Sequence, residues 1–140
     1  MSNSSALCID ASVVIRIVTS DAATNLWESW MADEIKIVAP SLLYYEVTNG
    51  LYRYYKAGIY PPEAVETTLR AALALPIELV TVSDLHPRAK EIAMRYNLPA
   101  TYDAHYLALA EWMEIDLWTA DTKLVNSLKP FKVKWVKGIE

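Results

Sequence analysis

The chain has 140 residues, a length that favours one domain with a single hydrophobic core over residues 1–140. Hydrophobic residues make up 54% and charged residues 21% of the sequence, which excludes a disordered chain. No apolar run approaches the roughly 18 residues that a membrane span needs. The formal net charge of −4 gives no overall sign of nucleic-acid binding.

The first half of the chain consists of short elements separated by Pro, Gly and Asn. An apolar run predicts a buried strand that ends at Asp10, and Ser12 is a candidate N-cap for the helix that follows. Pro40 suits the first turn of a later helix. The predicted elements are a strand at 6–9, helices at 13–18 and 21–31, a strand at 35–38 and a helix at 40–56.

The second half continues the alternation of helices and strands. Two prolines, Pro61 and Pro62, open a helix that Pro76 stops, and Ser83 or Asp84 caps the next one. The predicted elements are a helix at 61–75, a strand at 78–82, helices at 84–96 and 103–113, a strand at 117–119, a helix at 122–128 and a strand at 133–136.

Short strands that alternate with helices indicate an α/β protein in which helices cover both faces of a parallel sheet. We expect a three-layer α/β/α sandwich whose central sheet is mainly parallel and has four or five short strands. Ligands of such sheets bind outside the carboxyl ends of the strands. Residues that directly follow a strand are therefore candidates for function.

Four acidic residues occupy informative positions. Asp10 directly follows the first strand, Asp121 follows the fourth, and Asp103 begins a helix beside free backbone N–H groups. Glu46 lies in an apolar stretch of helix, where an unpaired carboxylate is costly. Each has a structural alternative: Asp103 and Asp121 as helix caps, Asp10 as a turn residue and Glu46 on a solvated helix edge. Their joint placement favours a shared site.

Carboxylates gathered in one pocket repel one another, which raises their pKa values, and a divalent cation removes that repulsion. Oxygen ligands suit Mg²⁺, which can bind a phosphate and activate a water for in-line attack. The histidines, His86 and His105, lack the partner spacing of a zinc site. The pattern therefore favours metal-assisted chemistry on a phosphate group.

The cellular compartment is inferred from the cysteine content and the N-terminus. Cys8 is the one cysteine, so no intrachain disulfide can form. Residues 1–5 are polar and lack the basic and apolar stretches of a secretory signal. We expect a cytoplasmic protein that does not contact a membrane.

Four segments around these acids resemble the acidic motifs of PIN-domain nucleases, in the order and at the approximate spacing of that family. They are residues 9–14 (IDASVV), 45–51 (YEVTNGL), 102–111 (YDAHYLALAE) and 118–124 (WTADTKL). The third segment is the most specific, since it is typical of the VapC-like toxins of type II toxin–antitoxin systems. The resemblance extends over nearly the whole chain.

The resemblance implies a parallel sheet flanked by helices and Mg²⁺- or Mn²⁺-dependent endonucleolytic cleavage of RNA. It also implies a homodimer, neutralised by a small cognate antitoxin whose tail enters the active-site groove. Carried over by position, the catalytic and metal-binding acids are Asp10, Glu46, Asp103 and Asp121. Two hydroxyl residues, Ser12 and Thr119, match supporting positions beside the first and fourth acids.

Other residues near the motifs are candidates for protein contacts, phosphate contacts or the core. Five tyrosines surround the helix at 42–56, and we expect some of them to form a dimer or antitoxin surface: Tyr44, Tyr45, Tyr52, Tyr54 and Tyr55. Three basic residues are candidates for phosphate contacts: Arg16, Arg53 and Lys123. Three tryptophans are expected in the core: Trp27, Trp112 and Trp118.

Two other functions are compatible with the same motifs. One is a PIN nuclease with a housekeeping role in RNA processing, and the other is a non-catalytic module that binds nucleic acid or a partner protein. A phosphoacceptor receiver or an aspartate phosphatase is disfavoured, because receivers have paired early acids and the phosphatases have Asp-x-Asp. Residues 10–12 of this chain (DAS) match neither pattern.

Overall fold

The computed structural model describes residues 5–139, which form a central sheet between two layers of helices. The five strands are all parallel, in the order β3-β2-β1-β4-β5. They are β1 (Ala6–Ile9), β2 (Lys36–Pro40), β3 (Glu78–Val80), β4 (Leu117–Thr119) and β5 (Val136–Gly138). This confirms the expected α/β fold.

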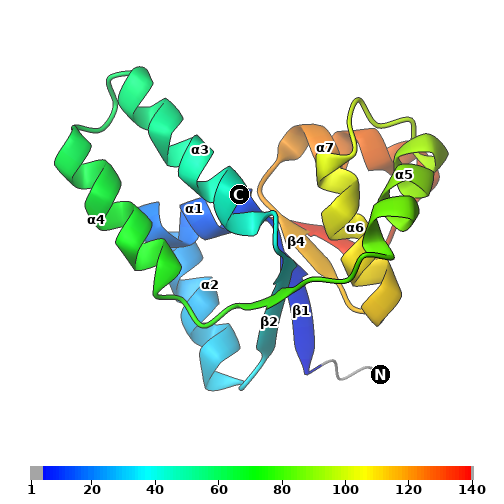
Figure 1. Cartoon of the computed structure of the whole chain (residues 1–140). Helices are drawn as coiled ribbons and strands as arrows, with labels where there is room; N and C mark the ends of the chain where they lie inside the picture. Colours follow the sequence, from blue (N-terminus) through cyan, green and yellow to red (C-terminus); the bar gives the residue numbers. More distant parts are fainter. Residues whose placement is uncertain (1–4, 140) are drawn as a thin grey trace.

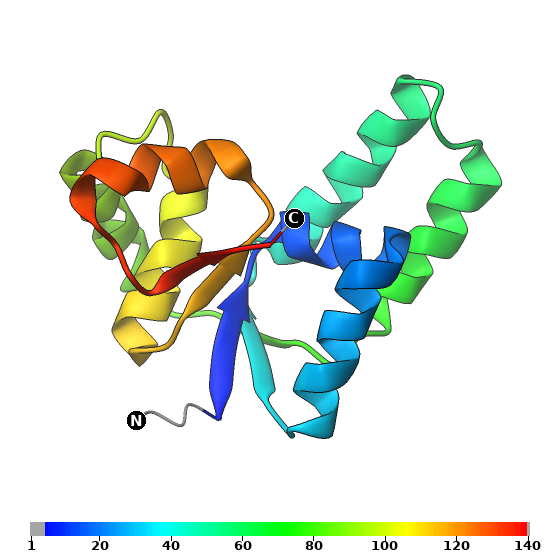
Figure 2. The same cartoon turned by 180° about the vertical axis from the view of Figure 1, so that it is seen from behind.

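Helices α1 to α4 lie on one side of the sheet and α5 to α7 on the other (Figure 1), and the view from behind shows the same layers (Figure 2). The first layer comprises α1 (Ala11–Thr19), α2 (Asp21–Ala32), α3 (Leu43–Lys56) and α4 (Pro62–Leu73). The second comprises α5 (Leu85–Arg95), α6 (Tyr102–Met113) and α7 (Thr122–Leu128), which continues into a 3₁₀ turn, η1 (Lys129–Phe131). No helix in residues 5–139 is long and apolar enough to cross a membrane.

The central strand β1 is buried on both faces, as its unbroken apolar run predicts for a parallel sheet. Cys8 and Ile9 are fully buried, as is Leu117 on the neighbouring strand β4. Because Cys8 lies in the core, burial raises the pKa of its thiol well above the ordinary value, and the charge of Asp10 adds to this effect.

Helix α3 packs closely against α1 because Gly50 has no side chain. A Cβ atom at Gly50 would lie 2.6 Å from Cδ1 of Ile15 on α1. This approach matters for function, because Glu46 lies one turn before Gly50 on α3. The glycine thus brings the Glu46 turn toward the start of α1.

Three predicted boundaries in the first half of the chain were wrong. Asp10, and not Ser12, is the N-cap of α1, because the chain turns into the helix directly after β1 and the Asp10 carboxylate accepts the Val13 N–H. Strand β2 extends through Pro40, which pairs with Val80 at the end of the strand, where a missing N–H is tolerated. Helix α3 therefore starts later than predicted, at Leu43.

The last strand lies further along the chain than the predicted 133–136. The turn η1 and a left-handed Lys132, with φ of 54°, delay the entry into β5. The expectation that Trp112 lies in the core was also wrong, since 43% of its surface is exposed. Trp27 is buried, and Trp118 packs edge-on against Trp30 at 5.5 Å between ring centres.

Candidate active site

All four predicted acids line one open pocket of about 510 Å³. Asp10 follows β1, Asp121 follows β4, and α3 and α6 contribute Glu46 and Asp103. The structure thus brings together residues that are up to 111 positions apart in the chain. The pocket lies at the carboxyl ends of the central strands, which is the usual ligand site of a parallel sheet.

Asp10 is buried and held by three hydrogen bonds. Its Oδ1 accepts from the Ser12 hydroxyl at 2.5 Å and from the Val13 N–H at 3.2 Å, and its Oδ2 accepts from the Thr119 hydroxyl at 2.5 Å. Burial raises the pKa of Asp10 from 3.8 to about 6, although these hydrogen bonds lower it; the charge of Asp103 raises it further.

The two predicted supporting residues, Ser12 and Thr119, connect the ends of β1 and β4. The Ser12 hydroxyl donates to Asp10 and accepts the Ala120 N–H at 2.8 Å. The Thr119 hydroxyl, which is fully buried, donates to Asp10 and accepts the Asp121 N–H at 3.0 Å. Each hydroxyl thereby fixes the Asp10 carboxylate relative to the segment that carries Asp121.

Glu46 is positioned by Tyr106, a residue to which the sequence analysis assigned no role at the site. The buried Tyr106 hydroxyl donates to Oε1 of Glu46 at 2.7 Å, and burial with the nearby carboxylate raises the pKa of Tyr106 far above its ordinary value. Tyr106 stands three residues after Asp103 on the same helix face, so helical periodicity supplied a signal for it. A buried tyrosine hydroxyl also requires a partner.

Asp103 and Asp121 complete the set of acids. Asp121 is the N-cap of α7 and accepts from the Lys123 and Leu124 N–H groups. It therefore caps the helix, as one interpretation of the sequence allowed, and also lines the pocket. Burial raises the pKa of Asp103 from 3.8 to about 6, and the charges of Asp121 and Glu46 add to this effect. The repulsion expected among clustered carboxylates is therefore present.

The donor set is chemically suited to Mg²⁺ or Mn²⁺, since it consists of carboxylate oxygens whose mutual repulsion a cation relieves. Among residues 5–139, however, no group of three His, Cys, Asp or Glu side chains is arranged to hold a single metal ion. The raised pKa of Asp103 shows that its charge is unfavourable beside Asp121 and Glu46, and a bound cation would relieve this repulsion.

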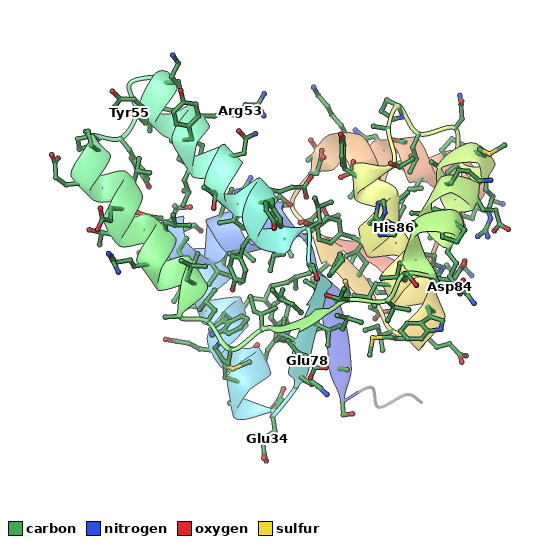
Figure 3. The ribbon with its side chains drawn as sticks, viewed as in Figure 1. Glu34, Arg53, Tyr55, Glu78, Asp84 and His86 are labelled. Atoms are coloured by element: carbon green, nitrogen blue, oxygen red, sulfur yellow. The ribbon has the colours of Figure 1, made fainter. Side chains whose placement is uncertain are left out.

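Of the three basic residues named as candidates for phosphate contacts, Arg53 lines the pocket. The polar side chains of Asn49 and Tyr102 line it as well. Figure 3 shows Arg53 extending from α3 toward the side of the molecule that carries α6 and α7. A guanidinium in this position offsets part of the negative charge at the rim of an otherwise acidic pocket.

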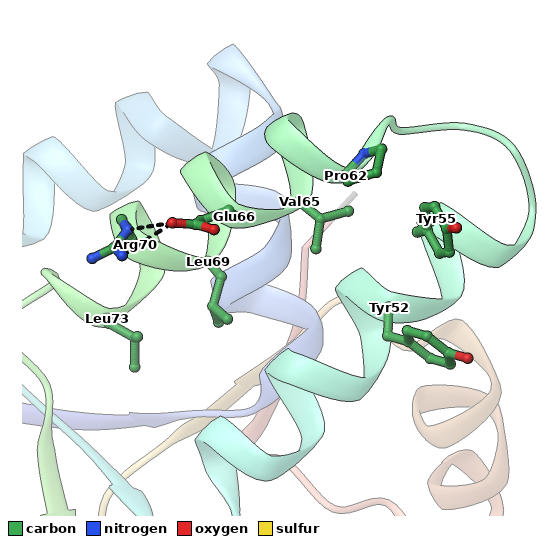
Figure 4. A pocket seen from close by; sticks show the side chains of 8 residues that line it. All are labelled: Tyr52, Tyr55, Pro62, Val65, Glu66, Leu69, Arg70 and Leu73. Atoms are coloured by element: carbon green, nitrogen blue, oxygen red, sulfur yellow. Dashed lines mark hydrogen bonds and ion pairs between the residues drawn. The ribbon is translucent and has the colours of Figure 1, made fainter.

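A second, apolar groove of about 620 Å³ lies between α3 and α4 (Figure 4). Val65, Leu69 and Leu73 of α4 face Tyr52 and Tyr55 of α3 across it. Among the tyrosines of α3, Tyr45, Tyr52 and Tyr55 are exposed. Tyr44 is half-buried and donates to the Ala72 carbonyl, and Tyr54 packs on Tyr60.

Comparison with a known protein family agrees with this geometry. Residues 7–126 match the model of the PIN domain. This span includes all four acids. No curated protein matches the sequence significantly.

Solved structures share the fold. A toxin–antitoxin complex from Klebsiella pneumoniae contains a chain that is 21% identical, with a TM-score of 0.66, over 93% of this chain and 94% of that one. PAE2754 from Pyrobaculum aerophilum is 21% identical, with a TM-score of 0.71, over 94% of this chain and 82% of that one. VapBC2 from Rickettsia felis, bound to a DNA fragment from its promoter, has a chain that is 13% identical, with a TM-score of 0.72, over 96% of this chain and 99% of that one.

Proposed function

This chain belongs to the PIN domain family, and we propose that it is a divalent-cation-dependent endoribonuclease, the toxin of a toxin–antitoxin pair. The observation that carries the proposal is the convergence of Asp10, Glu46, Asp103 and Asp121 on one open pocket. We further propose that residues 1–140 form one nuclease domain that acts on RNA in the cytoplasm.

In this proposal the four acids hold Mg²⁺ or Mn²⁺ and the hydroxyls of Ser12 and Thr119 support them. A divalent cation here would supply charge for a phosphate oxygen of the RNA and lower the pKa of an attacking water.

Neighbouring residues position the acids. The Ser12 and Thr119 hydroxyls hold the buried Asp10, whereas Asp103 is half-buried at the pocket. Tyr106 holds one oxygen of Glu46 and leaves the other free for a ligand. Arg53 at the rim attracts the negatively charged RNA backbone toward the acids.

We propose that the partners are a cognate antitoxin protein and a second copy of this chain. Two of the solved neighbours are described as toxin–antitoxin or VapBC assemblies, which supports an antitoxin partner. The apolar groove between α3 and α4, with its exposed Tyr52 and Tyr55, supports a protein contact at that end of the molecule. A monomer in sedimentation at micromolar concentration would contradict the dimer.

The direct test is cleavage of a panel of structured RNAs by the purified protein with Mg²⁺, with Mn²⁺ and with EDTA. We expect cleavage with either metal, none with EDTA, and none by Asp10→Asn. The matched control is Asp33→Asn, which removes an exposed acid outside the pocket. Absence of cleavage, together with absence of Mg²⁺ and Mn²⁺ binding in calorimetry, would instead indicate a binding module without catalysis.

A further inference from the structure

A separate cavity of about 390 Å³ adjoins the carboxylate pocket at the carboxyl ends of β2 and β3. The segments after these strands and the first turns of α5 and α6 form its walls. Leu42 and Tyr102 line both cavities. An RNA strand with one phosphate at the carboxylates therefore has a neighbouring nucleotide within reach of this cavity.

The walls combine apolar surface with hydroxyl groups. Val82 and Leu85 are apolar, whereas Ser41 and Thr81 contribute hydroxyls that are hydrogen-bonded to each other. Tyr102 stands between the two cavities, and 60% of its surface is exposed. This combination suits a flat ligand with apolar faces and a polar edge.

Two histidines complete the walls, His86 from α5 and His105 from α6. His86 Nδ1 lies 2.9 Å from His105 Nε2, and His105 Nδ1 lies 2.7 Å from the Thr101 carbonyl oxygen. Figure 3 shows the His86 side chain lying against α6.

These contacts determine where the hydrogens of the neutral pair lie. A carbonyl oxygen only accepts, so His105 Nδ1 carries a hydrogen and a neutral His105 then accepts at Nε2. His86 must donate to it from Nδ1. Nε2 of a neutral His86 is therefore an acceptor that the pair does not use, on an exposed side chain at the cavity wall.

We propose that this cavity binds one base of single-stranded RNA, next to the phosphate that the carboxylates cleave. In this arrangement Tyr102 stacks on the base, and Nε2 of His86 accepts an N–H from the base edge. The site selects which base stands beside the cut. This inference rests on the nuclease function proposed above.

A nucleobase fits these walls better than a side chain from a protein partner does. An apolar side chain would make no hydrogen bond to Nε2 of His86, which is exposed and would keep water as its partner. A base uses that acceptor and covers the partly exposed Val82 with its apolar face. The cavity also adjoins the pocket that all four acids line, where the proposed function places the RNA backbone.

The first experiment is metal-dependent cleavage of an RNA oligonucleotide with randomised positions, read by sequencing of the products. We expect wild type to prefer one base beside the cut by about fivefold to tenfold, the worth of one hydrogen bond. His86→Ala removes that preference by lowering cleavage at the preferred base. Lys90→Ala, one turn further along the exposed side of α5, keeps the preference. An unchanged preference in His86→Ala would overturn the base site.

The second experiment does not depend on cleavage. Adenosine, cytidine, guanosine and uridine are titrated separately while NMR resonances of His86 and Tyr102 are recorded, in wild type and in Asp103→Asn. At least one nucleoside should shift both residues in both proteins. No shift with any nucleoside would overturn the base site even if RNA is cleaved. Shifts without any cleavage by wild type would leave the base site standing and contradict the nuclease function.

Discussion

Removal of the Asp103 charge should stabilise the metal-free protein. Asp103 lines the acidic pocket, and burial together with the charges of Asp121 and Glu46 raises its pKa from 3.8 to about 6. The folded state therefore binds a proton more tightly than the unfolded state does. This contribution to stability is fully present below about pH 4 and is lost as the pH rises through about 6. Asparagine does not ionise, so Asp103→Asn retains it at neutral pH.

The size of the effect follows from the shift in pKa. A rise of about 2 units corresponds to about 3 kcal/mol for a wholly buried group. Because Asp103 is only half-buried, solvent screening reduces this to about 1.5 kcal/mol. For a chain of this length, that increase in the free energy of unfolding raises Tm by about 5 °C.

The assay is thermal and urea unfolding in EDTA across a pH series from about 4 to about 8, the range over which Asp103 loses its proton. Wild type should lose stability relative to Asp103→Asn as the pH rises through about 6, while Asp33→Asn should follow wild type. Saturating Mg²⁺ should then narrow the gap, because it stabilises wild type more than the variant. A variant less stable than wild type at neutral pH in EDTA would refute the argued repulsion among the acids.

Three further predictions concern single groups at the site and in the core. Tyr106→Phe removes the hydrogen bond to Glu46, and calorimetry should show at least about tenfold weaker Mn²⁺ binding; an unchanged affinity would contradict the positioning role. Thr119→Val leaves the Asp121 N–H without its partner and should cost about 1–3 kcal/mol in urea unfolding, whereas Thr119→Ser retains the hydroxyl and most of the stability. The Cys8 thiol should not react with a thiol reagent until urea unfolds the chain, and rapid labelling of the folded protein would contradict its burial.

Local patterns in the sequence predicted most of the fold. The apolar run before Asp10 indicated a doubly buried strand, and the alternation of strands and helices indicated a parallel sheet. These predictions succeeded because burial and helical periodicity determine the spacing of apolar residues along the chain, which the sequence shows directly. The boundaries that failed, at Ser12 and Pro40, depended on how one strand end meets its neighbours in the sheet, which local propensity does not report.

The sequence determined by itself which acids are present, in which order, and that Asp10 and Asp121 follow strands. Only the tertiary structure decided that Tyr106 holds Glu46, and that Thr119 joins Asp10 to the backbone of Asp121. The hydrogen bonds from Tyr106 to Glu46 and from Thr119 to Asp10 join residues 60 and 109 positions apart, so their geometry depends on the packing of whole helices and strands. The raised pKa values of the acids have the same origin, because burial and mutual repulsion exist only once the chain has folded.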